Sequence, residues 1–180
     1  MRIAIFLNTS WNIYNFRLSL LKALKAEGHT ILCIAPSDEY SQKIIAEGFV
    51  FEHLSVAAKS SNPFLDLAMT FRLRQILKRH KTEVLLNYTI KPNIYGTFAA
   101  KTLNIRCINN VSGLGTVFLR KGLASTMALV LYKWVFRFPE KVFFQNSHDL
   151  RLFVKLKLVA KIKSSSVSRS LRSSMLFTLL

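Results

Sequence analysis

Polar side chains gather where an apolar run meets a helical pattern in residues 85–101, LLNYTIKPNIYGTFAAK. The apolar run ends at Leu86, and Pro92 is typical of the first turn of the helix that follows. The hydrogen-bonding residues around this junction are Asn87, Tyr88, Thr89, Lys91 and Asn93. Such groups at a strand end form either a plain turn or the rim of a binding cleft.

The segment that follows the first apolar run, NTSWNIYNFR (residues 8–17), contains no glycine. A nicotinamide enzyme would carry a G-x-G-x-x-G fingerprint here, because glycine lets the backbone approach a pyrophosphate, so that cofactor is disfavoured. The segment suits a sugar, which presents hydroxyl groups at its edge and C–H groups on its faces. An equally favoured alternative is a helix start capped by Ser10 or Asn12. Its neutral hydrogen-bonding and aromatic residues are Asn8, Thr9, Trp11, Asn12, Tyr14 and Asn15.

Two glycines mark a third polar segment, NVSGLGTVF (residues 110–118). The backbone N–H groups around Gly113 and Gly115 are suited to holding an anion, although ordinary turns also use glycine. The four histidines are scattered along the chain, and no Asp-x-Asp pair is present. We therefore expect neither a zinc site nor a metal ion that clamps a sugar nucleotide.

These segments lie within an alternation of strand and helix patterns. Apolar periodicity predicts helices at residues 15–27 and 63–80, and Phe64, Leu67, Ala68 and Phe71 mark one face of the second. Strands separated by helices imply a Rossmann-like α/β domain, a mainly parallel sheet with helices on both faces. Ligands bind at the carboxyl ends of such strands, where the polar segments lie. Strands are predicted at residues 2–7, 30–35, 49–53, 83–87, 106–110 and 141–144.

The chain has 180 residues, enough for one sizeable core. Cys33 and Cys107 lie in apolar runs, so we expect buried reduced thiols. The apolar N-terminal run is too short for a signal peptide and predicts the first strand of a cytoplasmic protein. The longest apolar stretch, residues 123–138, is interrupted by Lys133 and Arg137, whereas a bilayer span needs about 20 largely uncharged residues.

The net charge is +17, and no acidic residue follows Asp149. This excess favours anionic partners such as phosphate groups, acidic lipid or nucleic acid. No nucleic-acid-binding module is recognisable, and the aromatic residues are spread through strands and loops. A basic nucleic-acid-binding domain is therefore the least favoured of the functional hypotheses.

Six motifs occur in order along the chain: NTSWNIYNFR, APSDEYS, NPFLDL, NYTIKPNIYG, INNVSGLGTVF and KVFFQNSHDLRLF. Taken together, they resemble the N-terminal domain of retaining family-4 glycosyltransferases with the GT-B fold. The resemblance covers about residues 1–160 and is strongest to bacterial enzymes that extend lipid-linked capsule, O-antigen or N-glycan precursors. It implies that the domain receives a lipid-linked saccharide acceptor, while a second Rossmann-like domain binds the nucleotide-sugar donor without a metal.

The resemblance also implies roles for individual residues, although it assigns no catalytic residue. Lys91 is the candidate for a phosphate contact, and Ser112, Gly113 and Gly115 are expected to face the donor. Many relatives have histidine where this chain has Ser112, which puts a histidine-based acceptor role in doubt. The expected acceptor-binding residues are Asn8, Thr9, Trp11, Asn15, Arg17, Tyr88, Thr89, Lys91 and Asn93.

Basic residues on two helical segments gain an interpretation from the same resemblance. They are expected to face an anionic leaflet, which places the protein at the cytoplasmic surface of the inner membrane. The alternative is an ordinary solvated helix face. The expected membrane-facing residues are Arg72, Arg74, Lys78, Arg79, Lys133 and Arg137.

The end of the chain departs from the family pattern. We expect a domain at residues 1–161 and an atypical Ser/Arg-rich tail at 162–180, either out of frame or a real tail that touches membrane. Glu140 is the last glutamate, so no Glu-x7-Glu donor motif follows in the downstream part of the chain, where the family pattern would place it. The chain is therefore expected to be inactive alone. An alternative is a non-catalytic membrane-surface subunit that recruits a separate donor-binding chain.

Overall fold

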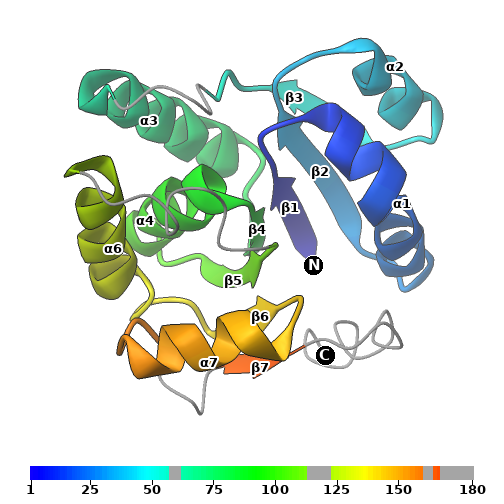
Figure 1. Cartoon of the computed structure of the whole chain (residues 1–180). Helices are drawn as coiled ribbons and strands as arrows, with labels where there is room; N and C mark the ends of the chain where they lie inside the picture. The colour runs from blue at the N-terminus through cyan, green and yellow to red at the C-terminus, as the bar shows by residue number, and fades with distance from the viewer. Residues whose placement is uncertain (57–61, 113–122, 160–163, 167–180) are drawn as a thin grey trace.

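The computed structural model describes residues 1–56, 62–112, 123–159 and 164–166, with 123–128 and 164–166 described by backbone alone. Its strands form one sheet in the order β3-β2-β1-β4-β5-β6-β7, and each neighbouring pair is parallel (Figure 1). The strands are β1 (Arg2–Phe6), β2 (Thr30–Ala35), β3 (Val50–His53), β4 (Val84–Tyr88), β5 (Arg106–Val111), β6 (Lys141–Phe144) and β7 (Ser164–Ser166).

Helices connect the strands and cover both faces of the sheet. Right-handed crossovers place α1 and α2 on one face and α3, α4 and α6 on the other (Figure 1). A π-helix, η1, precedes α4. The helices are α1 (Ser10–Ala26), α2 (Glu39–Ala46), α3 (Pro63–Arg79), η1 (Pro92–Gly96), α4 (Thr97–Thr102), α6 (Leu123–Val135) and α7 (Ser147–Lys155).

The strand side chains alternate between two cores. Ile3 and Ile5 of β1 pack with Leu21 of α1, whereas Phe6 packs with Leu73 of α3 on the other face. A third cluster joins β6, α6 and α7, and its centre is Phe153, which is fully buried. Because both faces are covered, the strands read as nearly continuous apolar runs, as the sequence does.

The predicted α/β architecture is confirmed. All six predicted strands are present within one residue at each end, and Cys33 and Cys107 are buried free thiols. The region predicted as an atypical tail, residues 162–180, includes strand β7, which pairs with β6. No helix within the described ranges combines the length and apolarity needed to cross a bilayer.

Two helical details differ from the sequence prediction. The first helix begins at Ser10 rather than near residue 15, because the Thr9 hydroxyl caps it by accepting a hydrogen bond from the Asn12 N–H. The apolar face predicted for α3 is exposed, and the buried stripe is formed by other residues. That stripe consists of Asp66, Met69, Thr70, Leu73, Ile76 and Leu77.

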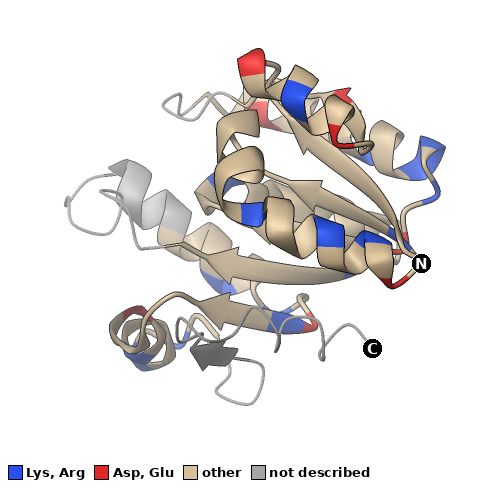
Figure 2. Ribbon diagram, turned by 90° about the vertical axis from the view of Figure 1, so that its right-hand side faces the viewer, with Lys and Arg blue, Asp and Glu red and all other residues tan. Residues whose placement is uncertain are grey.

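Basic residues are distributed over several helices and strand ends rather than gathered at one point (Figure 2). Ion pairs engage part of the small acidic complement, including Lys22–Glu47, Arg2–Glu83 and Arg106–Glu140. With a net charge of +17, most cations have no acidic partner to neutralise them. The surface as a whole therefore attracts anions.

Candidate functional site

The carboxyl ends of β1, β4 and β5 bring three polar segments of the sequence together. In the parallel register Phe6 lies beside Asn87, and Tyr88 lies beside Asn110. The chain runs outward from β1 to β3 and then returns to β4 on the other side of β1, so the strand order reverses between β1 and β4. Open α/β sheets bind their ligands at such a switch point.

Arg17 and Tyr88 face each other at this switch point. The Arg17 guanidinium carbon lies 4.5 Å from the centre of the Tyr88 ring, which is a cation–π geometry. Burial raises the pKa of the Tyr88 phenol, and the Arg17 charge opposes that rise. The Arg17 Nε–H is buried without an acceptor among the described residues. Arg17 therefore presents a cation with an unused donor at the edge of the sheet.

The first turns of α1 carry the remaining residues predicted in the segment 8–17. Trp11 is 44% exposed and packs edge-on against Phe16, with ring centres 5.2 Å apart. The Asn15 side chain donates to the Trp11 carbonyl at 2.9 Å. Thr9 is committed to capping the helix. An aromatic surface next to amide groups is retained here, as the interpretation as a sugar site requires.

Thr89 makes the sharp turn that ends β4. Its φ of +69° is unusual for a β-branched residue, and such strain gathers at functional sites. The Thr89 hydroxyl is buried with no hydrogen-bond partner in the described structure. The turn leads within a few residues into η1, and π-helical turns are also frequent at functional sites.

Lys91 does not extend freely into the site, because it is paired with a carboxylate that the sequence reasoning missed. Its Nζ lies 2.5 Å from Asp66 Oδ1, and the two side chains are 14% and 7% exposed. The Tyr95 hydroxyl donates to Asp66 Oδ2 at 2.8 Å. Burial and Asp66 together raise the pKa of Tyr95. Asp66 thereby ties the first turn of α3 to the segment after β4.

A network of amides and one hydroxyl lies beneath this turn. Asn87 donates to Asn109 Oδ1 at 2.9 Å, and Asn109 donates to the Thr97 hydroxyl at 2.8 Å. Asn93 donates to the Asn110 carbonyl at 2.9 Å. A Cβ at Gly96 would meet Asn87 Oδ1 at 2.1 Å. Glycine is therefore required at this position for η1 to approach β4 so closely.

Several buried polar atoms at this edge lack a hydrogen-bond partner within the described ranges. They include Asn8 Oδ1, Arg17 Nε, Asn87 Oδ1 and Thr89 Oγ1. Buried polar groups are nearly always hydrogen-bonded in folded proteins. Their gathering beside the switch point is typical of a surface that binds a polar ligand.

The residues predicted to face the donor are Ser112, Gly113 and Gly115, and the structure describes only the first of them. Ser112 is partly buried, and its hydroxyl donates to Asn110 Oδ1 at 3.4 Å, whereas Gly113 and Gly115 lie outside the described residues. The roles assigned to all three stay predictions.

The basic residues lie away from the switch point. Arg79 pairs with Glu52 at 2.7 Å, Arg74 is partly buried, and Arg72 and Lys78 are exposed on α3. Lys133 and Arg137, at the end of α6 and just beyond it, are exposed as well. The membrane-facing role of these residues also stays a prediction. Within the described residues no three His, Cys, Asp or Glu side chains are grouped as metal ligands would be.

The profile of the glycosyl transferase 4-like family matches residues 2–146. The chain belongs to this family. It is 29% identical over 177 residues to N,N'-diacetylbacillosaminyl-diphospho-undecaprenol alpha-1,3-N-acetylgalactosaminyltransferase of Campylobacter jejuni, covering 93% of this chain and 47% of that enzyme. The chain thus spans about half the length of this curated relative.

Solved structures agree on the fold. A glycosyltransferase from Rickettsia africae superposes with a TM-score of 0.69 at 17% identity, over 93% of this chain and 42% of that one. The UDP-GlcNAc 2-epimerase of Methanocaldococcus jannaschii gives 0.67 at 14% identity, over 93% and 45%. This glycosyl transferase 4-like chain is therefore one Rossmann-like half of a GT-B architecture. The fold alone does not select the reaction, because an epimerase shares it.

The structure brings the predicted segments to one edge of the sheet, but sequence reasoning missed the contacts that Asp66, Asn109 and Phe16 make there. Asp66 has a recognisable signal, because it lies three, seven and eleven residues before Met69, Leu73 and Leu77 on one helical stripe. A carboxylate on a buried stripe requires a partner. No comparable signal marks Asn109 or Phe16.

Proposed function

We propose that this chain is the acceptor-binding half of a retaining glycosyltransferase that transfers a sugar from a nucleotide-sugar to a lipid-linked saccharide. The product would serve capsule, O-antigen or related surface polysaccharide synthesis at the cytoplasmic face of the inner membrane. The observation that carries the proposal is the Campylobacter relative, whose name gives an undecaprenol-diphosphate-linked acceptor and which covers 93% of this chain.

The geometry at the switch point supports an acceptor of this chemistry. A diphosphate needs cations and N–H donors, and Arg17 supplies both beside Tyr88. Saccharide hydroxyls need amides and hydroxyls, which Asn8 and Thr89 leave unpaired. Sugar faces need an exposed aromatic surface, which Trp11 and Phe16 form.

The donor contacts are proposed to come from a second domain or a separate chain. The matched region is 47% of the relative, and positioning of both reactants is worth about 7–11 kcal/mol of the reaction barrier. We therefore expect the 180-residue chain by itself to bind an acceptor without turning over a sugar nucleotide.

Acceptor binding tests this function directly. The purified W134F chain, whose remaining tryptophan is Trp11, is titrated with an undecaprenyl-diphosphate-linked saccharide in detergent, and its fluorescence reports binding. Arg17→Ala is expected to weaken the Kd about tenfold or more, because one charge-assisted hydrogen bond contributes about 1.5–3 kcal/mol. The matched control is Arg151→Ala, at an exposed position of α7, which should leave the Kd unchanged. Absence of binding, or equal losses in both variants, would overturn the proposal.

A further inference from the structure

The outer face of α3 exposes large apolar side chains at one end and cations at the other. Phe64 is 80% exposed, Leu67 64% and Phe71 57%. Their spacing of three and four residues aligns them along one stripe, which continues through Arg74 and Lys78. We call Phe64, Leu67 and Phe71 the apolar stripe. Side chains of this size at such exposure mark an interaction surface.

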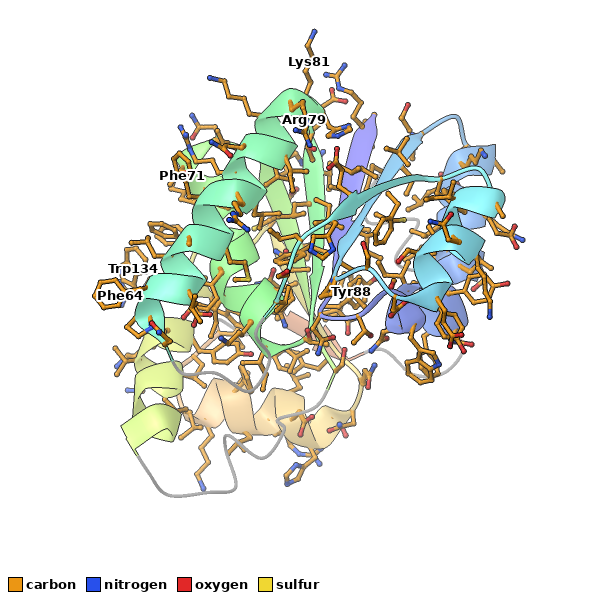
Figure 3. All side chains as sticks on the ribbon, turned by 90° about the horizontal axis from the view of Figure 1, so that it is seen from above. Phe64, Phe71, Arg79, Lys81, Tyr88 and Trp134 are labelled. Atoms are coloured by element: carbon orange, nitrogen blue, oxygen red, sulfur yellow. The ribbon has the colours of Figure 1, made fainter. Side chains whose placement is uncertain are left out.

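The apolar end of α3 lies at the carboxyl edge of the sheet, where the candidate site is. In Figure 3 Phe64 and Phe71 project outward from α3, Trp134 lies on the same side of the molecule, and Arg79 and Lys81 lie at the far end of the helix. Asp66, in the same turn as Phe64, holds Lys91 and Tyr95 of the segment after β4. The buried carboxylate of Asp66 thus connects the turn that carries the apolar stripe to the segment after β4 at the candidate site.

We propose that the apolar stripe of α3 inserts into the interfacial region of an anionic lipid bilayer and directs the carboxyl edge of the sheet toward it. This inference extends the proposed function, because it names the surface by which the site meets a lipid-linked substrate. The aromatic end enters the acyl boundary, and the basic second half of α3 remains among the headgroups, as in an interfacial amphipathic helix.

Charge selects the bilayer over other occupants. Asp66 is the single acidic residue of α3, and its carboxylate is buried and paired, so the exposed part of the helix has cations and no carboxylate of its own. Among these cations, Arg79 is paired with Glu52 of β3. An anionic leaflet complements that surface. A second copy would bring an α3 surface that again carries cations and no exposed carboxylate, so it offers these cations no anionic partner.

The area of the stripe points the same way. Three partly exposed side chains of 150–250 Å² offer roughly 400 Å², about half of the ~800 Å² that each partner of a stable protein complex buries. Insertion into lipid has no such minimum area, because each buried apolar group adds its own share.

Partition of the full 180-residue chain into vesicles tests the inference. No saccharide acceptor is present, so a negative result would refute membrane insertion without bearing on acceptor binding. Phe64→Ser with Phe71→Ser is expected to weaken partition to phosphatidylcholine vesicles with about one-third phosphatidylglycerol by tenfold or more. The matched control is Ile45→Ser with Val50→Ser, two exposed apolar residues at the end of α2 and the start of β3, away from the candidate site, and it should partition like the parent. Circular dichroism verifies that both variants are folded.

A single fluorescent reporter locates the inserted residues. In a chain whose two tryptophans are replaced (W11F with W134F), F64W should shift to the blue on vesicle binding and be quenched by bromolipids, whereas I45W, at the end of α2, should do neither. The inference is overturned if the parent chain does not bind vesicles, or if the two double-serine variants bind equally. It is also overturned if the F64W reporter stays solvent-exposed in the bound protein. Self-association that Phe64→Ser abolishes would instead assign the stripe to a second copy.

Discussion

Replacement of Asp66 by alanine gives the sharpest test of how the segment after β4 is held. The substitution leaves the Lys91 ammonium, 14% exposed, without its carboxylate and the Tyr95 hydroxyl without its acceptor. Breaking a buried ion pair from one side costs about 3–5 kcal/mol. Because Lys91 retains some contact with solvent, we expect the lower end, a loss of about 3 kcal/mol in the free energy of unfolding. With an m-value of about 2–3 kcal/mol/M, the urea midpoint should fall by about 1 M or slightly more.

The second half of the experiment separates the ion pair from simple loss of packing. Removing both charges, as Asp66→Ala with Lys91→Met, takes away the uncompensated ammonium and should return stability to within about 1 kcal/mol of the parent. The double-mutant cycle should give a coupling energy of about 2 kcal/mol. Urea titrations followed by far-UV circular dichroism at neutral pH measure all four proteins. A near-parental midpoint for Asp66→Ala alone, or strictly additive losses in the double variant, would refute the reasoning.

Three further predictions concern other parts of the sheet. Gly96→Ala forces its new methyl group against the fully buried Asn87 side chain and should lower the free energy of unfolding by about 1–3 kcal/mol. The loss should be smaller in an Asn87→Ala background, and equal losses in both backgrounds would contradict the contact. Burial raises the pKa of the Cys33 thiol from 9.0 to about 12, so stability is full below pH 9 and falls as the pH rises toward 12. Alkylation of Cys33 at pH 8 should require unfolding, and rapid native labelling in a mass-spectrometric time course would disprove this. The hydrogen bond from Arg106 holds the pKa of Glu140 below its ordinary 4.5, so the pair contributes above that pH and is lost as the pH falls through the lower folded value. Both side chains are about half exposed, so Arg106→Gln should cost less than about 1 kcal/mol at neutral pH and nothing in strong acid.

The strands could be predicted from sequence because they are buried on both faces. Runs such as RIAIF and TILCIA bury every residue after the first, so the apolar signal is continuous and ends where burial ends. The start of α1 was harder to locate. Trp11, Asn12 and Tyr14 are weak helix formers, and the cap comes from Thr9 rather than from the Ser10 or Asn12 that the pattern offered.

The orientation of α3 shows the limit of periodicity. The same helix carries an apolar stripe outward and a stripe containing Asp66 and Thr70 inward, so a count of apolar residues alone selects the wrong face for the core. The Asp66 carboxylate is satisfied only by Lys91 and Tyr95, which are more than twenty residues away in the chain. No local pattern encodes such a contact.

The sequence predicts at which edge of the sheet the candidate site lies, but not how its side chains contact one another. The rule that ligands bind at the carboxyl ends of parallel strands locates residues 8–17 and 87–93 correctly on one edge. The contact of Arg17 with Tyr88 depends on how α1 packs against the end of β4, and the φ of Thr89 is set where the chain leaves that strand. Such packing is a tertiary property that no local sequence pattern encodes. The role of Lys91 as a phosphate ligand stays a prediction. A phosphate would have to compete with Asp66 for the Lys91 ammonium.

The position of β1 in the middle of the sheet has a consequence for synthesis on the ribosome. One edge of β1 pairs with β2, which emerges soon afterwards, but its other edge waits for β4, whose Val84 lies beside Ile3. Until residue 84 has left the exit tunnel, a nascent β1-β2-β3 unit presents an unpaired apolar strand edge, which is a template for aggregation. Closure of that long chain segment is the non-local step that should limit the rate of folding. We therefore expect that a chaperone which binds the nascent chain would protect the unpaired edge of β1 until β4 has been synthesised.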